Sequence, residues 1–199
     1  MLNKKCLMCL MILFFVVNLL APKADAIILG IRGDDLAEAV EYGKKNKKTK
    51  LSDFTKAWTV SLGNNVGWAT LYTGFHNVAY KSRKAAIEHK ELINIGINQA
   101  LEISKVLTFT VSIFGNSMDF AQEYHAMIEI DKSFVPPDYE FIPEYAEPSE
   151  FWPESPDYVA GCVFKFPVNS IKEDSVVKLI LKPFDGEVLQ FTFDLSKMK

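Results

Sequence analysis

Hydrophobic and polar residues alternate along much of this chain with a period of two, which is typical of half-buried strands. The pattern is clearest in segment 107–113, where Leu, Phe, Val and Ile occupy every second position. Six other segments show the same alternation or are rich in β-branched and aromatic residues: 58–62, 68–72, 124–130, 158–166, 177–181 and 189–195. Turn sequences at 63–67 and 183–186 separate neighbouring members of this set. The pattern therefore predicts about seven strands, with at least two hairpins.

Helical spacing of apolar residues replaces this alternation in two places. The sequence Asp35-Leu-Ala-Glu38 resembles a capping box and predicts a short helix that begins there. Segment 75–104 has helical spacing over two stretches, the second from Glu91, and predicts a helical insertion packed on a sheet. Strands and helices do not alternate as in a parallel α/β sheet. We therefore expect an α+β, mainly β fold: an antiparallel β-sandwich of about seven strands with a helical insertion.

The segment 135–157 matches neither period. It contains six prolines and seven acidic residues but no basic one, a composition that predicts no regular element. Its aromatic residues would be costly to leave in water: Phe141, Tyr145, Phe151 and Trp152. We expect this acidic, proline-rich segment, called the strap below, to lie across the surface of the domain.

The first 26 residues have the three regions of a secretory signal peptide. Two lysines at positions 4 and 5 precede the apolar run 7–20, and Ala24-Asp25-Ala26 supplies small residues for cleavage. The run is shorter than the stretch of about 18 apolar residues that a membrane span needs. The sequence therefore predicts a cleavable signal peptide at 1–26, a single mature domain at 27–199, and a periplasmic or extracellular location.

Removing this leader changes the charge and the cysteine count. It carries three lysines and one aspartate, so the 22 basic and 25 acidic residues of the chain become 19 and 24. An acidic domain is a poor partner for nucleic acid, and we expect no nucleic-acid binding. Cys162 alone remains, and its strand face also carries Phe164 and Phe166, so we expect a buried and unreactive thiol.

No motif for catalysis, a cofactor or a metal is present in the predicted mature chain. The three histidines, His76, His89 and His125, have no metal-site spacing. Ser175-Val-Val-Lys178 matches the Ser-x-x-Lys string of penicillin-recognising enzymes, but that string requires a helix, and here it falls in a predicted strand. We therefore predict no catalytic, cofactor-binding or metal-binding residue.

Two charged regions are candidates for a partner surface. The basic loop 44–50 carries Lys44, Lys45, Lys47, Lys48 and Lys50. The strap supplies Tyr145, Phe151 and Trp152. The lysines have several interpretations: a solvated loop, contact with the acidic strap within one molecule or between two, or contact with anionic lipid or cell-wall polymer.

These observations favour an exported, non-catalytic binding domain with a protein or cell-envelope partner. A carrier or sensor of an apolar small molecule is an alternative, and a pocket lined by Phe109, Phe164, Phe191 or Phe193 would support it. A second alternative is an enzyme whose site is assembled from loops. Convergence of His76, His125 and a carboxylate in one cleft would support that function.

Overall fold

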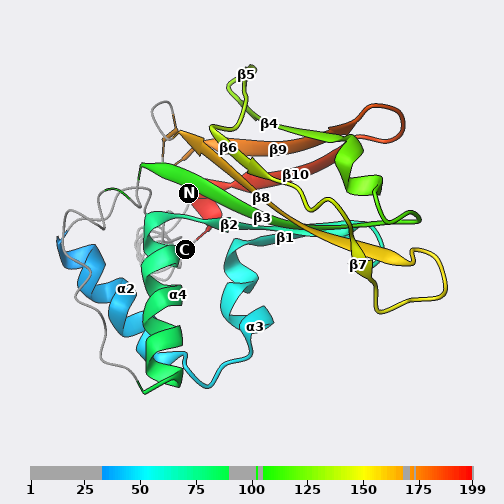
Figure 1. The fold of residues 1–199 in the computed structure, drawn as a ribbon. Coiled ribbons are helices and arrows are strands. Elements are labelled where there is room, and N and C mark those ends of the chain that lie inside the picture. Colours follow the sequence, from blue (N-terminus) through cyan, green and yellow to red (C-terminus); the bar gives the residue numbers. More distant parts are fainter. Residues whose placement is uncertain (1–32, 90–101, 103–104, 168–170, 173, 199) are drawn as a thin grey trace, which may run out of the picture.

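The computed structural model of the protein describes residues 33–89, 102, 105–167, 171–172 and 174–198. The predicted leader and, apart from residue 102, the second stretch of the predicted insertion lie outside these residues. The described chain forms ten strands in two antiparallel sheets, with helices on one side (Figure 1). The predicted α+β, mainly β sandwich is therefore confirmed.

The larger sheet, sheet A, presents its strands in the order β1-β2-β3-β8-β6, and β7 also pairs with β8. The bounds are β1 Thr59–Gly63, β2 Gly67–Tyr72, β3 Val106–Gly115, β8 Tyr158–Pro167, β6 Tyr139–Phe141 and β7 Glu147–Pro148. The smaller sheet, sheet B, has the order β10-β9-β4-β5. Its bounds are β10 Leu189–Asp194, β9 Val176–Pro183, β4 Tyr124–Ile130 and β5 Ser133–Val135.

Three α-helices and three 3-10 turns complete the described chain. They are α2 Gly33–Lys45, α3 Leu51–Thr55, α4 Gly74–Ile87, η1 Lys56–Trp58, η2 Phe120–Glu123 and η3 Leu195–Lys197. Helix α2 begins at Gly33, before the predicted capping residue Asp35, which instead lies in the first turn, where a carboxylate suits the helix dipole. Helix α4 is the first stretch of the predicted insertion.

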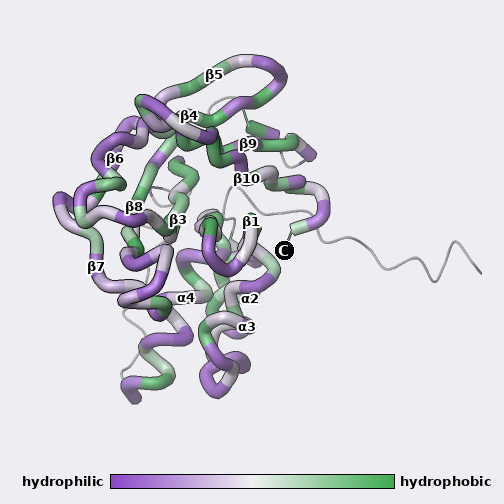
Figure 2. Tube along the Cα trace, turned by 90° about the vertical axis from the view of Figure 1, so that its right-hand side faces the viewer, coloured by the Kyte–Doolittle hydropathy of each residue, from purple (hydrophilic) through white to green (hydrophobic). Residues whose placement is uncertain are grey.

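One part of the core lies between the two sheets, where it follows from the alternation along the strands, and another part lies between sheet A and the helices, with Phe54 and Trp58 fully buried. Every second residue of β3 and β8 is buried, as are those of β9 and β10. The rings of Phe109 and Phe193, one from each sheet, have centroids 5.2 Å apart. Viewed from the side, sheet B, sheet A and the helices form successive layers (Figure 2).

The helical layer packs on the outer face of sheet A, the face turned away from sheet B. Helices α2 and α4 cross at Gly43, where an added Cβ would lie 2.2 Å from the Ala79 carbonyl oxygen. The hydroxyl of Ser82 donates to the Val40 carbonyl at 2.7 Å across the same crossing. This close approach fixes the two helices against each other beside one end of β2.

Candidate functional site

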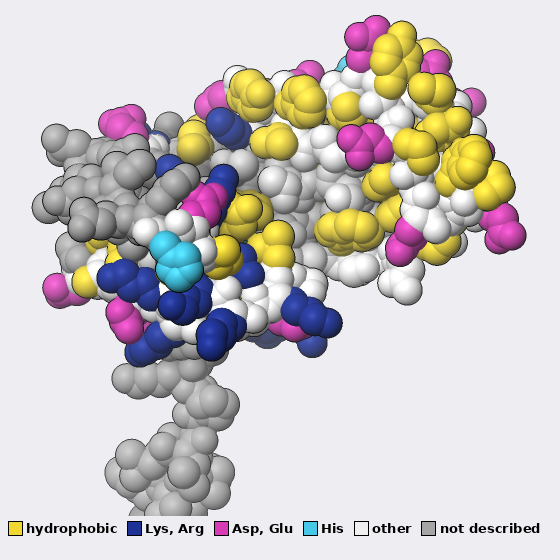
Figure 3. All heavy atoms as spheres, turned by 60° about the horizontal axis from the view of Figure 1, so that its bottom comes forward, with side chains coloured by type: hydrophobic (Ala, Val, Ile, Leu, Met, Phe, Trp, Pro, Cys, Tyr) yellow, Lys and Arg dark blue, Asp and Glu magenta, His cyan; other side chains and the backbone are white. Residues whose placement is uncertain are grey.

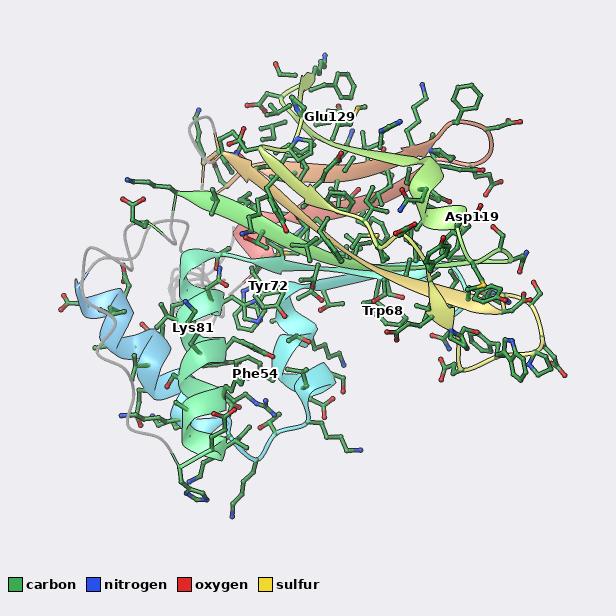
Figure 4. All side chains as sticks on the ribbon, viewed as in Figure 1. Phe54, Trp68, Tyr72, Lys81, Asp119 and Glu129 are labelled. Carbon is green, nitrogen blue, oxygen red and sulfur yellow. The ribbon has the colours of Figure 1, made fainter. Side chains whose placement is uncertain are left out.

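Sheet A has an outer face that the helices cover only in part. Chain direction explains this, because β2 ends at Tyr72 and α4 begins at Gly74, so the helices gather at the Tyr72 end. Tyr72 and Trp68 both point to the outer face, and only Tyr72 lies against the helical layer (Figure 4). The Trp68 end of the face is left for another segment to cover.

The strap borders this open half. Strand β6 pairs with β8 through Tyr139 opposite Lys165, and β7 pairs with β8 through Glu147 opposite Val159. The Ala146 amide donates to the Met118 carbonyl at 2.6 Å, which joins the strap to the chain after β3. The strap is thus hydrogen-bonded along the sheet, and β6 and β7 are strands that its proline-rich composition does not predict.

Between the strap and the sheet lies a groove of about 370 Å³. Its floor consists of small and aliphatic residues of β3 and β8, and its wall is formed by the strap. The lining residues are Ser112, Val159 and Gly161 on the floor, with Phe141, Pro143, Tyr145 and Glu147 on the wall. This volume is within the range of about 300–1,000 Å³ that ligand sites commonly have.

Register places the floor residues side by side. Ser112 on β3 lies opposite Gly161 on β8, and Trp68 lies opposite Ser112 on its other side. A Cβ added at Gly161 would have no heavy atom within 4 Å. The glycine therefore leaves open space above the sheet instead of permitting a close packing contact.

Aromatic rings continue from the groove along the outer face. The ring centroids of Trp68 and Phe114 are 5.6 Å apart, and those of Phe114 and Phe151 are 5.8 Å apart. Phe151 is thus held against the sheet, whereas Trp152 next to it is exposed. Tyr145 is 60% exposed although it forms part of the wall, so a ligand in the groove can reach its ring.

Glu147 is the one carboxylate in the lining of the groove. Glu147 in the wall is exposed, and the described residues give it no ion pair. The strap contributes six more carboxylates and no basic residue. A cation does lie beside it: the Lys165 ammonium of β8 is 4.8 Å from the ring centroid of Tyr139.

The basic loop lies elsewhere. Lys44 and Lys45 end α2, Lys47, Lys48 and Lys50 follow it, and all five are exposed. Arg83 of α4 anchors the loop by donating to the backbone carbonyls of Asn46 and Thr49. Lysine and arginine side chains gather over the helices, whereas hydrophobic side chains gather at the other end of the molecule (Figure 3). No ion pair connects these lysines to the strap within the described ranges.

His76 is buried in the helical layer. Its ring stacks between Trp58 and Tyr72, each with a centroid separation of 4.2 Å. Burial lowers the pKa of His76 to about 4, against a smaller opposing effect of its hydrogen bond to the Leu71 carbonyl. His125 is exposed on β4 of sheet B, so the two histidines are on different layers. No cluster of His, Cys, Asp and Glu suitable for a metal occurs in the part of the chain that the structure describes.

The other candidate groups are structural. Cys162 is buried on the inner face of β8, and burial raises the pKa of its thiol to about 12. Ser175 is buried, and its hydroxyl accepts from the Lys172 amide at 3.0 Å. The phenylalanines proposed for a carrier pocket are fully buried between the sheets, where their packing offers no support for that alternative: Phe109, Phe164, Phe191 and Phe193.

Sequence reasoning included Tyr145 in the candidate surface but missed the rest of the groove. Ser112, Gly161 and Glu147 were not predicted, and Phe141 was recognised only as an aromatic residue of the strap. One signal was present: a glycine within a strand often marks a place where something approaches the backbone closely. The floor could not be assigned to a site from the sequence, because its position beneath the strap depends on where the strap pairs with β8.

No family model matches this chain, and no curated protein sequence matches it. None of the described helices has the length and apolar character that crossing a membrane requires.

Proposed function

We propose that this protein is an exported, non-catalytic binding domain, and that it binds a protein partner of the cell envelope or its surroundings through the groove beneath the strap. The leader pattern at 1–26 supports export. The observation that carries the binding role is the open space above Gly161, bordered by rings and a carboxylate.

The composition of the groove suits recognition better than catalysis. Its lining contains one titratable carboxylate, one hydroxyl of a serine and one of a tyrosine, and no histidine, cysteine or lysine. Partly exposed rings such as Tyr145 and Phe141 provide a large contact area that loses little conformational entropy on binding. Aromatic residues are also enriched at protein interfaces.

Site-specific photocrosslinking in the exporting cell tests this proposal. The photoreactive residue p-benzoylphenylalanine is introduced at Tyr145 in the groove, and at Phe134 on sheet B as a matched control, since Phe134 is also an exposed aromatic residue. We expect a discrete adduct from position 145 that position 134 does not form.

A blocking variant then tests whether the adduct depends on the groove. Gly161→Phe fills the open space, and its backbone is not in the left-handed region, so the fold should tolerate the ring. Thr192→Phe on the exposed face of β10 is the control. The adduct should disappear in Gly161→Phe and persist in Thr192→Phe, with thermal melts of both variants recorded. An identical adduct pattern at positions 145 and 134, or one that Gly161→Phe leaves unchanged, contradicts the proposal.

A further inference from the structure

The walls of the groove offer ring faces and a carboxylate to the same small volume. Phe141 and Tyr145 are about half exposed, and Glu147 lies with them in the lining. An ammonium or guanidinium group close to an aromatic face is attracted by the ring quadrupole, and a neighbouring carboxylate adds direct charge attraction. This combination matches a cation more closely than it matches a neutral apolar group.

The charge near the groove also favours a cationic ligand. Glu147 lines the groove, and the six other carboxylates of the strap add negative charge nearby without lining it, against one neighbouring cation, Lys165, which already contacts Tyr139. An anionic ligand would be repelled, while a neutral ligand that covered Glu147 would remove its hydration without offering a counter-charge. A basic ligand avoids both costs.

The protein itself shows that this surface accommodates a cation on a ring. Tyr139 and Lys165 are directly opposite each other in the β6–β8 ladder, and the ammonium lies 4.8 Å from the ring centroid. Phe141 occupies the next position on the same face of β6, two residues along. The groove begins where this built-in contact ends, with Phe141 and Tyr145 exposed and no lysine of β8 opposite them.

We infer that the groove binds the cationic head of an arginine or lysine side chain in a basic segment of a partner protein. The head lies against Phe141 and Tyr145 and pairs with Glu147, above the floor that Gly161 leaves open. This inference rests on the proposed function, because it names the chemistry of the partner that the same groove takes.

A peptide titration followed by NMR tests the inference on the purified, isotope-labelled protein. The probe is the acetylated and amidated peptide Gly-Arg-Gly-Arg-Gly, and its matched control carries citrulline at both arginine positions, which removes the charge but nearly keeps the shape. We expect the arginine peptide to shift the amide resonances of Ser112, Val159 and Gly161. The citrulline peptide should bind at least about tenfold more weakly, because it loses both the cation–π contact and the ion pair.

Two matched variants test whether the Glu147 carboxylate is the charge that binds the arginine peptide. Glu147→Gln should weaken binding of the arginine peptide about fivefold, as expected for loss of one partly solvated ion pair. Glu154→Gln removes the same charge from an exposed strap residue that does not line the groove, and should change affinity less than twofold. Equal affinity for the two peptides, or equal effects of the two substitutions, overturns the inference.

The results also separate this inference from the proposed function. A groove-dependent adduct at Tyr145 in cells, with no preference for the arginine peptide, overturns the cationic ligand and leaves the binding domain intact. Loss of both the adduct and the peptide response overturns both. A third result is a shift of the groove resonances with protein concentration alone that the double variant Lys47→Glu, Lys48→Glu abolishes. In that case the basic loop of a second copy fills the groove, and the inference of a different partner is wrong.

Discussion

Acid should destabilise this protein through one buried side chain, His76. The side chain has no exposed surface and stacks between Trp58 and Tyr72. The carbonyl of Leu71 can only accept, so Nδ1 carries the proton and donates to it over 2.9 Å. Nε2 is buried and has no hydrogen-bond partner among the described residues. Protonation would therefore place a charge in an aromatic environment with nothing shown to neutralise it.

The size of the effect follows from the pKa. Burial lowers the pKa of His76 from 6.5 to about 4, so between these values the unfolded chain binds a proton that the folded chain does not. The contribution of His76 to the free energy of unfolding is thus largest above pH 6.5 and falls as the pH falls towards 4. At 1.36 kcal/mol for each pKa unit, the full loss is about 3 kcal/mol, and about 2 kcal/mol of it occurs between pH 7.5 and pH 5.

Urea unfolding monitored by tryptophan fluorescence at pH 7.5, 6 and 5 measures this loss. His76→Phe keeps a ring between Trp58 and Tyr72 but cannot titrate. Between pH 7.5 and pH 5 its free energy of unfolding should therefore fall by about 2 kcal/mol less than that of wild type. The lost hydrogen bond should lower its free energy of unfolding by about 1 kcal/mol at every pH. His125→Gln, at an exposed site, should retain the wild-type slope. Equal slopes for His76→Phe and wild type would refute the reasoning. NMR titration of the His76 ring protons gives the folded-state pKa directly.

Three further substitutions or reactions test the packing. Gly43→Ala should lower the free energy of unfolding by about 1–3 kcal/mol in a thermal or urea melt, because its Cβ would meet the backbone oxygen of Ala79 at 2.2 Å. The control, Ala37→Gly on the exposed side of α2, should lower it by no more than about 1 kcal/mol. Phe193→Ala should lower the free energy of unfolding by about 3–5 kcal/mol by opening a cavity between the sheets; a loss under 1 kcal/mol would contradict the assignment of the core. Cys162 should not react with iodoacetamide at pH 8 in the native protein, but should react in guanidinium; mass spectrometry measures both. Rapid labelling of the native protein would contradict the burial of this thiol.

The main strands could be predicted because alternation and burial coincide in them. Segment 107–113 shows this best, since its apolar positions are the buried ones in β3. The three strands that were missed, β5, β6 and β7, have three residues or fewer, too short for a period to be visible. Helix α3, with five residues, was missed for the same reason. These elements are defined by tertiary pairing and not by a local pattern.

The candidate groove was predictable only on its strap side. Tyr145 is one of several aromatic residues in the acidic, proline-rich strap, and such a group of rings is unusual in a solvated loop. Ser112 and Gly161 come from strands that are 49 residues apart at these positions, and their approach depends on the β3–β8 register. That register is set by the buried inner faces of β3 and β8, whose residues carry no information about what lies on the outer face of the sheet.

The positions of the two charged regions affect how a basic partner approaches. The acidic strap pairs along the β8 edge of sheet A, whereas the exposed lysines from Lys44 to Lys50 lie at the C-terminal end of α2 and in the loop that follows it. A basic segment is attracted by the first region and repelled by the second, so the charge distribution orients the encounter as well as strengthening it. Reversing the charge of Lys47 and Lys48 removes the repulsion far from the groove. Such a change should alter the association rate and its salt dependence, while the dissociation rate should depend on Glu147 and on the rings that we infer to contact the cation.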